Sequence, residues 1–302
     1  MRVAFLGSPE PAAVVLSEVL RAGHDVAVVV TRPDKRRSRS GAPSPTPVKA
    51  LAERFAIPVE YTPRGCLGYG AEIGIVVAYG RIIPADVLAG LDMVNVHFSL
   101  LPRWRGAAPV ERALLGGDET TGVCLMKVEE GLDTGPVYRR AELAIRPSDT
   151  AAGLTDRLAT LGAALLVEAL ADGLGDPEPQ VGEPTYAAKL TSADLELDWN
   201  RPAAELERVV RAGRAWTTWR DERLLVLKAE ATQDQGPPGR LDGDIVFTAT
   251  GALRLVEVQP QAKRPMDAVS WLRGARPAPG EHLGSAQPPG SRDVFETYGL
   301  PS

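Results

Sequence analysis

Four short, continuous apolar runs constrain the fold of this chain most strongly. They occupy residues 2–7, 26–31, 73–78 and 93–98, and the first two are separated by residues 12–20, whose apolar positions follow helical spacing. Strands that are apolar throughout, rather than at every second position, are typical of parallel sheets covered by helices on both faces. The sequence therefore predicts an α/β fold with a doubly wound, mostly parallel sheet.

Further elements extend this sheet and lead into a second domain. We expect a helix at 47–55, a short strand at 57–60, a helix at 108–115, strands at 122–128 and 137–145, and an amphipathic helix at 150–171 capped by Asp149 or Thr150. Residues 172–193 are rich in Gly, Pro, Asp and Glu, which is typical of a linker. We place the boundary near Lys189, so that residues 1–188 form the first domain, with its linker beginning at about residue 172.

The rest of the chain predicts a small β domain and a tail. After a helix at 202–212, short apolar runs at 224–229, 243–248 and 252–259 are separated by Gly and Pro turns, which favours a small β-barrel over residues 189–284. Residues 285–302 have few apolar side chains, and we expect them to form a flexible tail. A chain of 302 residues is long enough for two cores.

Composition excludes several classes of function. The chain has 2 Cys and 3 His, and neither residue type has metal-ligand spacing, so we expect no metal site. A net charge of −5 argues against binding of a polyanion over the whole surface, although a local basic patch remains compatible with it. The first residues do not resemble a signal peptide and no apolar run has membrane-spanning length, so we expect a cytoplasmic protein without a membrane partner.

Polar side chains cluster where one of the buried strands ends. Asn95, His97 and Ser99 alternate along extended chain and therefore share one face. Ligands of open parallel sheets bind beyond the carboxyl ends of the strands. An isolated histidine here is more often a structural residue, and Asp133, which follows between Gly131 and Gly135, is by itself an ordinary turn residue. The pattern alone leaves both interpretations open.

Longer motifs around these residues resemble the methionyl-tRNA formyltransferases. They are Asn95-Val96-His97-Phe98-Ser99-Leu100-Leu101-Pro102, Arg103-Trp104-Arg105-Gly106-Ala107-Ala108-Pro109 and Gly131-Leu132-Asp133-Thr134-Gly135. The resemblance extends over nearly the whole chain, except for the final tail. It implies a Rossmann-like N-terminal domain that holds 10-formyltetrahydrofolate, followed by an OB-like β-barrel that helps to bind the initiator methionyl-tRNA.

The resemblance also assigns roles to individual residues. Asn95, His97 and Asp133 match the catalytic trio of that family. Acyl transfer to an amine develops an oxyanion, which Asn95 and a protonated His97 can stabilise. The role of Asp133 is then to hold the imidazolium of His97. The predicted folate contacts are Ser99, Leu100, Leu101 and Pro102, with the backbone of Ala78, Tyr79 and Gly80 beside the pterin. We expect a monomer that uses the folate as co-substrate and no metal.

Basic residues are candidates for contact with the tRNA phosphates. The resemblance points to a loop that carries Arg36, Arg37 and Arg39 and to Lys263 and Arg264 on the second domain. Short basic runs are more often solvated surface loops, so this assignment depends mainly on the resemblance.

Two other functions stay open at this point. A sugar-amine N-formyltransferase, acting on a nucleotide sugar, shares the trio and the folate, whereas a tRNA-binding protein with an inactive transferase domain would bind without turnover. A dehydrogenase is disfavoured because the first turn, Gly7-Ser8-Pro9, has one glycine in place of the dinucleotide-binding fingerprint.

Overall fold

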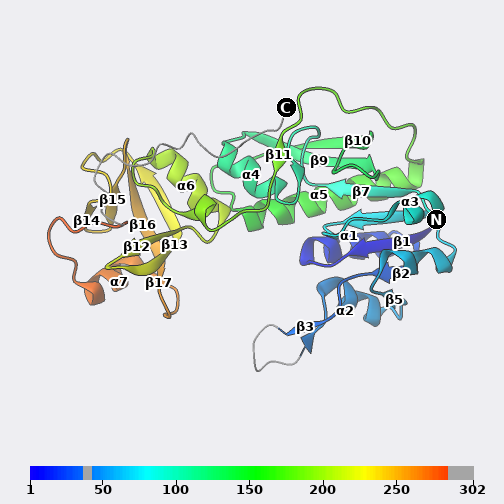
Figure 1. Cartoon of the computed structure of the whole chain (residues 1–302), viewed down its shortest axis with the longest axis horizontal. Helices are drawn as coiled ribbons and strands as arrows, with labels where there is room; N and C mark the ends of the chain where they lie inside the picture. Colours follow the sequence, from blue (N-terminus) through cyan, green and yellow to red (C-terminus); the bar gives the residue numbers. More distant parts are fainter. Residues whose placement is uncertain (37–42, 285–302) are drawn as a thin grey trace, which may run out of the picture. The chain divides into compact units, whose positions relative to one another are not determined.

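A seven-stranded sheet organises the first part of the chain (Figure 1). The computed structural model describes residues 1–36 and 43–284, and the chain divides into two compact units, Met1–Leu190 and Thr191–Ser302. The strand order of the sheet is β10-β9-β7-β6-β1-β2-β5. Its strands are β1 (Arg2–Gly7), β2 (Asp25–Val30), β5 (Val59–Glu60), β6 (Ile73–Val77), β7 (Met93–His97), β9 (Thr120–Lys127) and β10 (Val137–Ala144).

Five strands of this sheet run parallel, and the two at one edge form the antiparallel pairs. β1, β2, β5, β6 and β7 pair in parallel, whereas β9 is antiparallel to both β7 and β10. The predicted mostly parallel sheet is confirmed, as is the fold class. Parallel neighbours require crossover connections, which the intervening helices supply.

Helices cover both faces of the sheet. One core gathers Val3, Phe5, Val94 and Val96 with apolar residues of α1, α2, α4 and α5, and the opposite face packs Leu6, Val76 and Met93 against η1 and α3. The helices of this unit are α1 (Glu10–Arg21), α2 (Pro47–Arg54), η1 (Pro63–Tyr69), α3 (Ala85–Gly90), α4 (Pro109–Gly116) and α5 (Ala151–Asp172).

Local signals in the sequence explain where these helices begin. The hydroxyl of Thr46 accepts a hydrogen bond from the backbone N–H of Lys49 at the start of α2, and that of Thr150 accepts one from Gly153 at the start of α5. Each satisfies one of the donors that a first helical turn leaves without a partner. Gly162 lets α5 lie close to the sheet, since a Cβ at that position would come within 2.7 Å of Val96 Cγ1.

Residues 172–188, which we expected to behave as a linker, are attached to the first unit. Val137 and Glu178 exchange two backbone hydrogen bonds of 2.8 and 2.9 Å. Further along, β11 (Tyr186–Ala187) pairs in parallel with β8 (Arg105–Gly106). Their composition gave no sign of this, because such short pairings need no run of apolar residues. The remaining short strands, β3 (Lys35–Arg36) and β4 (Pro43–Ser44), pair with each other.

The second unit contains an antiparallel sheet with the strand order β12-β13-β16-β15-β14, and β17 also pairs with β16. Leu224, Val226, Leu253 and Val258 are buried in it, and α6 and α7 pack on the sheet. The turn spacing predicted a small β-barrel, and the structure confirms a second β domain, in the form of an antiparallel sheet. Its elements are η2 (Ala193–Leu195), α6 (Ala203–Ala212), β12 (Trp216–Trp219), β13 (Glu222–Thr232), β14 (Leu241–Asp242), β15 (Ile245–Phe247), β16 (Ala252–Pro260), β17 (Met266–Asp267) and α7 (Ala268–Ala275).

None of the helices in the described ranges has the length and hydrophobicity that a membrane span requires.

Candidate active site

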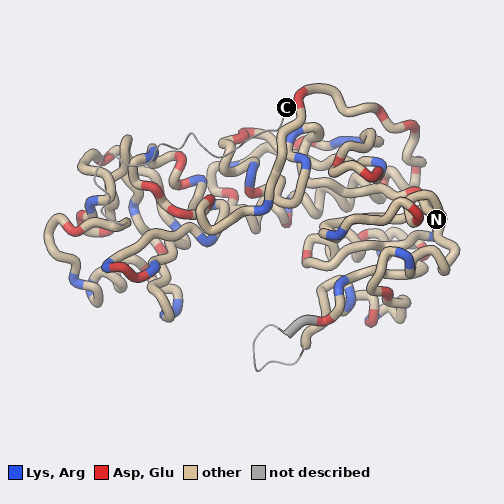
Figure 2. The backbone as a smooth tube through the Cα atoms, in the orientation of Figure 1, with Lys and Arg blue, Asp and Glu red and all other residues tan. Residues whose placement is uncertain are grey.

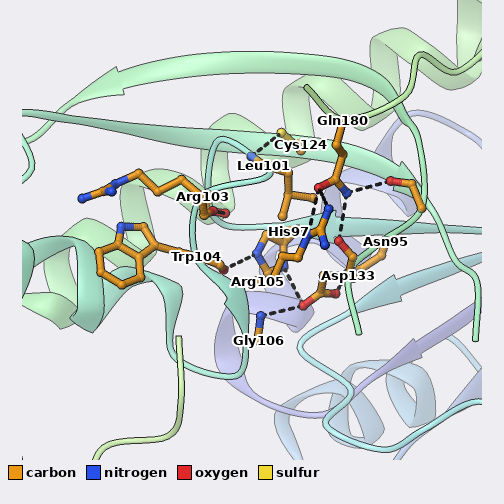
Figure 3. A network of polar contacts seen from close by, with 12 residues as sticks. Asn95, His97, Leu101, Arg103, Trp104, Arg105, Gly106, Cys124, Asp133 and Gln180 are labelled. Carbon is orange, nitrogen blue, oxygen red and sulfur yellow. Dashed lines mark hydrogen bonds and ion pairs between the residues drawn. The ribbon is translucent and has the colours of Figure 1, made fainter. Parts of the chain in front are cut away.

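Strand β7 presents two polar side chains on the face of the sheet that α5 does not cover. Val94 and Val96 point into the core that contains α5. Because successive side chains of a strand point to opposite faces, Asn95 and His97 lie on the other face. There Leu101 packs against Cys124 and Met126 of β9 and Val137 of β10, and Figure 3 shows it beside Cys124. The alternation predicted from the sequence therefore directs both polar groups into one site.

His97 is buried, with 5% of its surface exposed, and both of its ring nitrogens face acceptors. Nε2 lies 3.0 Å from the carbonyl oxygen of Trp104, and because a carbonyl can only accept, Nε2 carries a proton and donates it. Nδ1 lies 3.7 Å from Oδ2 of Asp133. Only the imidazolium form has a proton for each of these two acceptors.

Asp133 brings the site together (Figure 3). Its Oδ2 accepts a hydrogen bond of 2.8 Å from the backbone N–H of Gly106, and its Oδ1 accepts one of 3.4 Å from Nδ2 of Asn95. The backbone of Asp133 has a φ of 50°, in the left-handed region. At Gly135 a Cβ would lie 1.9 Å from the carbonyl oxygen of Lys127, so the second flanking glycine is needed for packing.

A second loop, residues 99–106, supplies the groups that hold His97 and Asp133. Its Ser99 hydroxyl donates to the carbonyl of Arg103 over 2.6 Å, and the Trp104 indole N–H donates to Oδ2 of Asp118 over 2.8 Å. Arg103 also donates to both oxygens of Asp118. These contacts fix the Trp104 carbonyl, at a residue whose φ is 63°.

The predicted folate contacts in this loop differ in their accessibility. Ser99 and Leu101 are buried, and Leu101 packs with Cys124, whose Sγ accepts a hydrogen bond of 3.4 Å from the Leu101 N–H. Burial raises the pKa of the Cys124 thiol, so that it stays neutral. Leu100 and Pro102 are half-buried. Direct contact with folate stays a prediction for all four residues of this stretch.

The segment predicted to border the pterin follows strand β6, which pairs in parallel with β7. Ala78 and Gly80 both have left-handed backbones, with φ of 45° and 68°. Arg32 donates to the carbonyl oxygen of Gly80 over 3.3 Å. Tyr79 is buried, and burial raises the pKa of its phenol. The Ile82 side chain just beyond is 89% exposed, so an apolar surface is available near the ends of these two strands.

The predicted tRNA contacts lie in both units. Arg36 belongs to β3, whereas Arg37 and Arg39 lie outside the described residues. Lys263 and Arg264 are exposed in the turn between β16 and β17. Basic and acidic positions are interspersed along the backbone of each unit (Figure 2), so any attraction for phosphate is local.

Sequence reasoning did not identify Gln180 or Asp118, which both contact the site loops. The Gln180 side chain hydrogen-bonds the carbonyls of Asp133 and Gly135, and Asp118 holds Arg103 and Trp104. Neither belongs to a recognisable motif, and the pattern of the sequence contains no signal for either. Among residues 1–36 and 43–284, no three His, Cys, Asp or Glu side chains gather as a metal site would require.

Comparisons with known proteins place this chain in a family. A family model described as formyl transferase matches residues 1–170, and one described as formyl transferase C-terminal domain matches residues 189–276. The chain is 42% identical over 292 residues to the methionyl-tRNA formyltransferase of Cereibacter sphaeroides, covering 91% of this chain and 96% of that protein.

Two solved structures resemble the fold at lower sequence identity. The methionyl-tRNA formyltransferase from Clostridium thermocellum aligns with a TM-score of 0.60 at 17% identity, over 76% of this chain and 93% of that one. An N-formyltransferase from Helicobacter canadensis, in complex with folinic acid and dTDP-3-aminofucose, aligns with a TM-score of 0.64 at 15% identity, over 84% of this chain and 98% of that one. These likenesses concern the fold alone.

Proposed function

This chain belongs to the methionyl-tRNA formyltransferase family, and from that premise we propose that Asn95, His97 and Asp133 carry the transfer of a formyl group to the amino group of methionyl-tRNA. The observation that carries the proposal is that one carboxylate, that of Asp133, gathers the amide of Asn95 and the imidazole of His97 within 3.4 and 3.7 Å. The formyl donor we propose is 10-formyltetrahydrofolate.

The chemistry requires donors for a developing negative charge. As the methionyl amine attacks the formyl carbon, the formyl oxygen gains negative charge, which positioned N–H groups stabilise. Asn95 Nδ2 has a second N–H beyond the one that it directs to Asp133. The separation of 3.7 Å between His97 Nδ1 and Asp133 is longer than a hydrogen bond, which leaves the Nδ1 proton available to the formyl oxygen.

The protons of the reaction must also balance. The amine loses one proton as the new C–N bond forms, and the folate nitrogen takes one up as its bond to the formyl carbon breaks. The Asp133 carboxylate lies within 3.4 Å of Asn95 Nδ2 and 3.7 Å of His97 Nδ1. We assign to it the removal of the amine proton through a water molecule and the delivery of that proton to the departing folate nitrogen. The carboxylate regains its negative charge next to His97 when the proton passes on to the folate nitrogen.

The positions of the substrates follow from the same arrangement. The loop at Ala78, Tyr79 and Gly80 and the stretch from Ser99 to Pro102 would hold the folate, with Ile82 offering apolar surface. Arg36, Arg37 and Arg39 and the exposed Lys263 and Arg264 would contact the phosphates of the initiator tRNA. We place the activity in the cytoplasm, where charged tRNA is used, and expect a monomer, which light scattering can test.

A sugar-amine N-formyltransferase remains the nearest alternative. The likeness to the enzyme from Helicobacter canadensis is limited to 15% identity, whereas the relative named for methionyl-tRNA is 42% identical over nearly its whole length. A tRNA-binding protein without turnover is disfavoured because the trio is intact and its side chains converge.

The experiment is formyl transfer by Asn95→Ala, His97→Ala and Asp133→Ala variants at saturating donor and methionyl-tRNA. We expect kcat to fall by about 10²-fold or more when either donor, Asn95 or His97, is removed. Removal of the Asp133 carboxylate should also lower kcat. Circular dichroism and tRNA binding should be unchanged, which would show that the variants fold. Near-normal rates in correctly folded variants would contradict the assignment.

A further inference from the structure

Gln180 makes four hydrogen bonds with one amide group (Figure 3). Its Nε2 donates to the carbonyl oxygens of Asp133 and Gly135, each over 2.8 Å. Its Oε1 accepts from Nε and Nη2 of Arg105, over 3.0 and 2.7 Å. A primary amide has two N–H donors and two acceptor lone pairs, so its hydrogen-bonding capacity is fully used.

The residues on either side hold Gln180 in this position. Upstream, Glu178 is bonded to Val137 through two backbone hydrogen bonds. Downstream, the Thr185 carbonyl accepts from the backbone N–H of Arg105 over 2.9 Å, and the Thr185 hydroxyl accepts from the backbone N–H of Trp104 over 2.9 Å. The segment from Glu178 to Thr185 is therefore fixed at both ends. It lies within residues 171–188, between the ranges that the two family models match.

The Asp133 loop has little apolar packing that could determine its conformation. Residues 129–132 are exposed, and the Leu132 side chain is 62% exposed. The backbone of Asp133 has a φ of 50°, in the left-handed region that residues other than glycine seldom adopt. Such a backbone persists only where the surroundings fix it, and the Gln180 amide is bonded to the carbonyl of that same residue.

We infer that Gln180 is a positioning residue for formyl transfer, which sets the Asp133 carboxylate against His97. The Gln180 side chain joins the backbone of Asp133 to the side chain of Arg105. The carboxylate of Asp133 also accepts a hydrogen bond from the backbone N–H of Gly106, the residue that follows Arg105. Two independent links therefore fix the Asp133 loop to the loop that carries the Trp104 carbonyl. This inference rests on the proposed roles of His97 and Asp133.

Two substitutions separate the halves of the Gln180 contact. Gln180→Glu keeps an acceptor for Arg105, but it removes the N–H groups and turns a carboxylate oxygen toward the carbonyls of Asp133 and Gly135. Gln180→Met has a similar size and removes both the acceptor and the donors. Gln235→Glu, on the second unit, is the matched control, since the Gln235 side chain is exposed and donates to the nearby Gln233 carbonyl.

For a positioning role we expect kcat to fall about tenfold or more in both Gln180 variants, because small misplacements of catalytic groups have large effects on rate. KM for methionyl-tRNA and for the folate should change less than about threefold. The ring ¹⁵N signals of His97 should shift, and they can be assigned by comparison with His97→Ala, because the chain has only 3 His. Gln235→Glu should leave all of these values unchanged.

Four outcomes decide the inference. Unchanged kcat and His97 signals in both Gln180 variants, with Asp133→Ala inactive, would overturn the role of Gln180 and leave the proposed function intact. A lowered melting temperature without a change in kcat would also overturn it, since that result describes a structural contact. Should the Gln180 variants fail to fold, Arg105→Met tests the other end of the same link, and wild-type kcat in it would equally count against the inference. An active Asp133→Ala variant would instead contradict the proposed function itself.

Discussion

Replacing Asp133 by Asn tests how much of the catalysis depends on one negative charge. Asn is nearly the same size as Asp, and its amide oxygen can still accept the hydrogen bond from the Gly106 N–H, which is 2.8 Å long in the native chain. The substitution therefore preserves the shape of the loop. The substitution removes the charge 3.7 Å from Nδ1 of His97 and, because the amide nitrogen takes the place of Oδ1, the acceptor of the 3.4 Å hydrogen bond from Asn95.

The magnitude follows from this distance and from the burial of the pair. Opposite unit charges 3.7 Å apart attract with about 4.5 kcal/mol at an effective dielectric constant of about 20. The His97 and Asp133 side chains are 6% and 14% exposed, so water screens the pair partially, and we take about 2–4 kcal/mol as the working range. If the imidazolium stabilises the transition state, this corresponds to a decrease of about 30- to 10³-fold in kcat.

The assay is single-turnover formylation at saturating donor and methionyl-tRNA, which isolates the chemical step. Asp149→Asn is the matched control. Asp149 is a buried carboxylate that pairs with a cationic side chain, that of Arg157, and it lies next to the start of α5, outside the trio. The control substitution should lower the free energy of unfolding and leave kcat within about threefold of the wild type. If Asp133→Asn itself stays within about threefold of the wild type, the electrostatic role assigned to Asp133 is refuted.

Three further predictions concern other parts of the chain. Gly162→Ala should lower the free energy of unfolding by about 1–3 kcal/mol in denaturant titrations, because its Cβ would lie 2.7 Å from Val96 Cγ1; an unchanged midpoint would show that α5 can move away. The hydrogen bond from Arg220 holds the pKa of the Glu281 carboxyl below its ordinary value of 4.5, so the pair stabilises the fold above about pH 4.5 and this effect disappears as the pH falls through the lowered pKa. Glu281→Gln should therefore lower the melting temperature at pH 7, and the difference from wild type should shrink in acid; a constant difference would contradict the linkage. Neutralising Lys263 and Arg264 should reduce the salt slope of tRNA binding by about 1 for each phosphate that these side chains neutralise in the wild type, and an unchanged slope would remove these residues from the interface.

The sheet could be predicted because most of its parallel strands are continuous apolar runs in the sequence. β1, β2, β6 and β7 are apolar runs that need both faces covered, and the predicted bounds of each differ from the observed ones by no more than one residue. The short strands β8 and β11 carry no such signal, since each contains two residues and forms only because the other is present. Their pairing depends on the tertiary fold, which explains why residues 172–188 were interpreted as a linker.

The candidate site was predictable to the extent that its residues occur in one motif. Asn95 and His97 follow from strand alternation, and Asp133 was linked to them by the resemblance. Gln180 lies 47 residues from Asp133 along the chain and 75 from Arg105. A single glutamine at such separations leaves no periodicity or spacing to interpret, so only the folded chain reveals what it contacts.

The most direct test of the account supplies the wild-type protein and its His97→Ala variant with 10-formyltetrahydrofolate and three competing acceptors. These are methionyl-initiator tRNA, a methionyl-elongator tRNA and an amino-sugar nucleotide, and mass spectrometry identifies which of them gains a formyl group. We predict that the wild type formylates the initiator methionyl-tRNA first and fastest and that the variant is slower by about 10²-fold or more. Preferential formylation of the amino sugar, or equal rates for the wild type and the variant, would contradict the account.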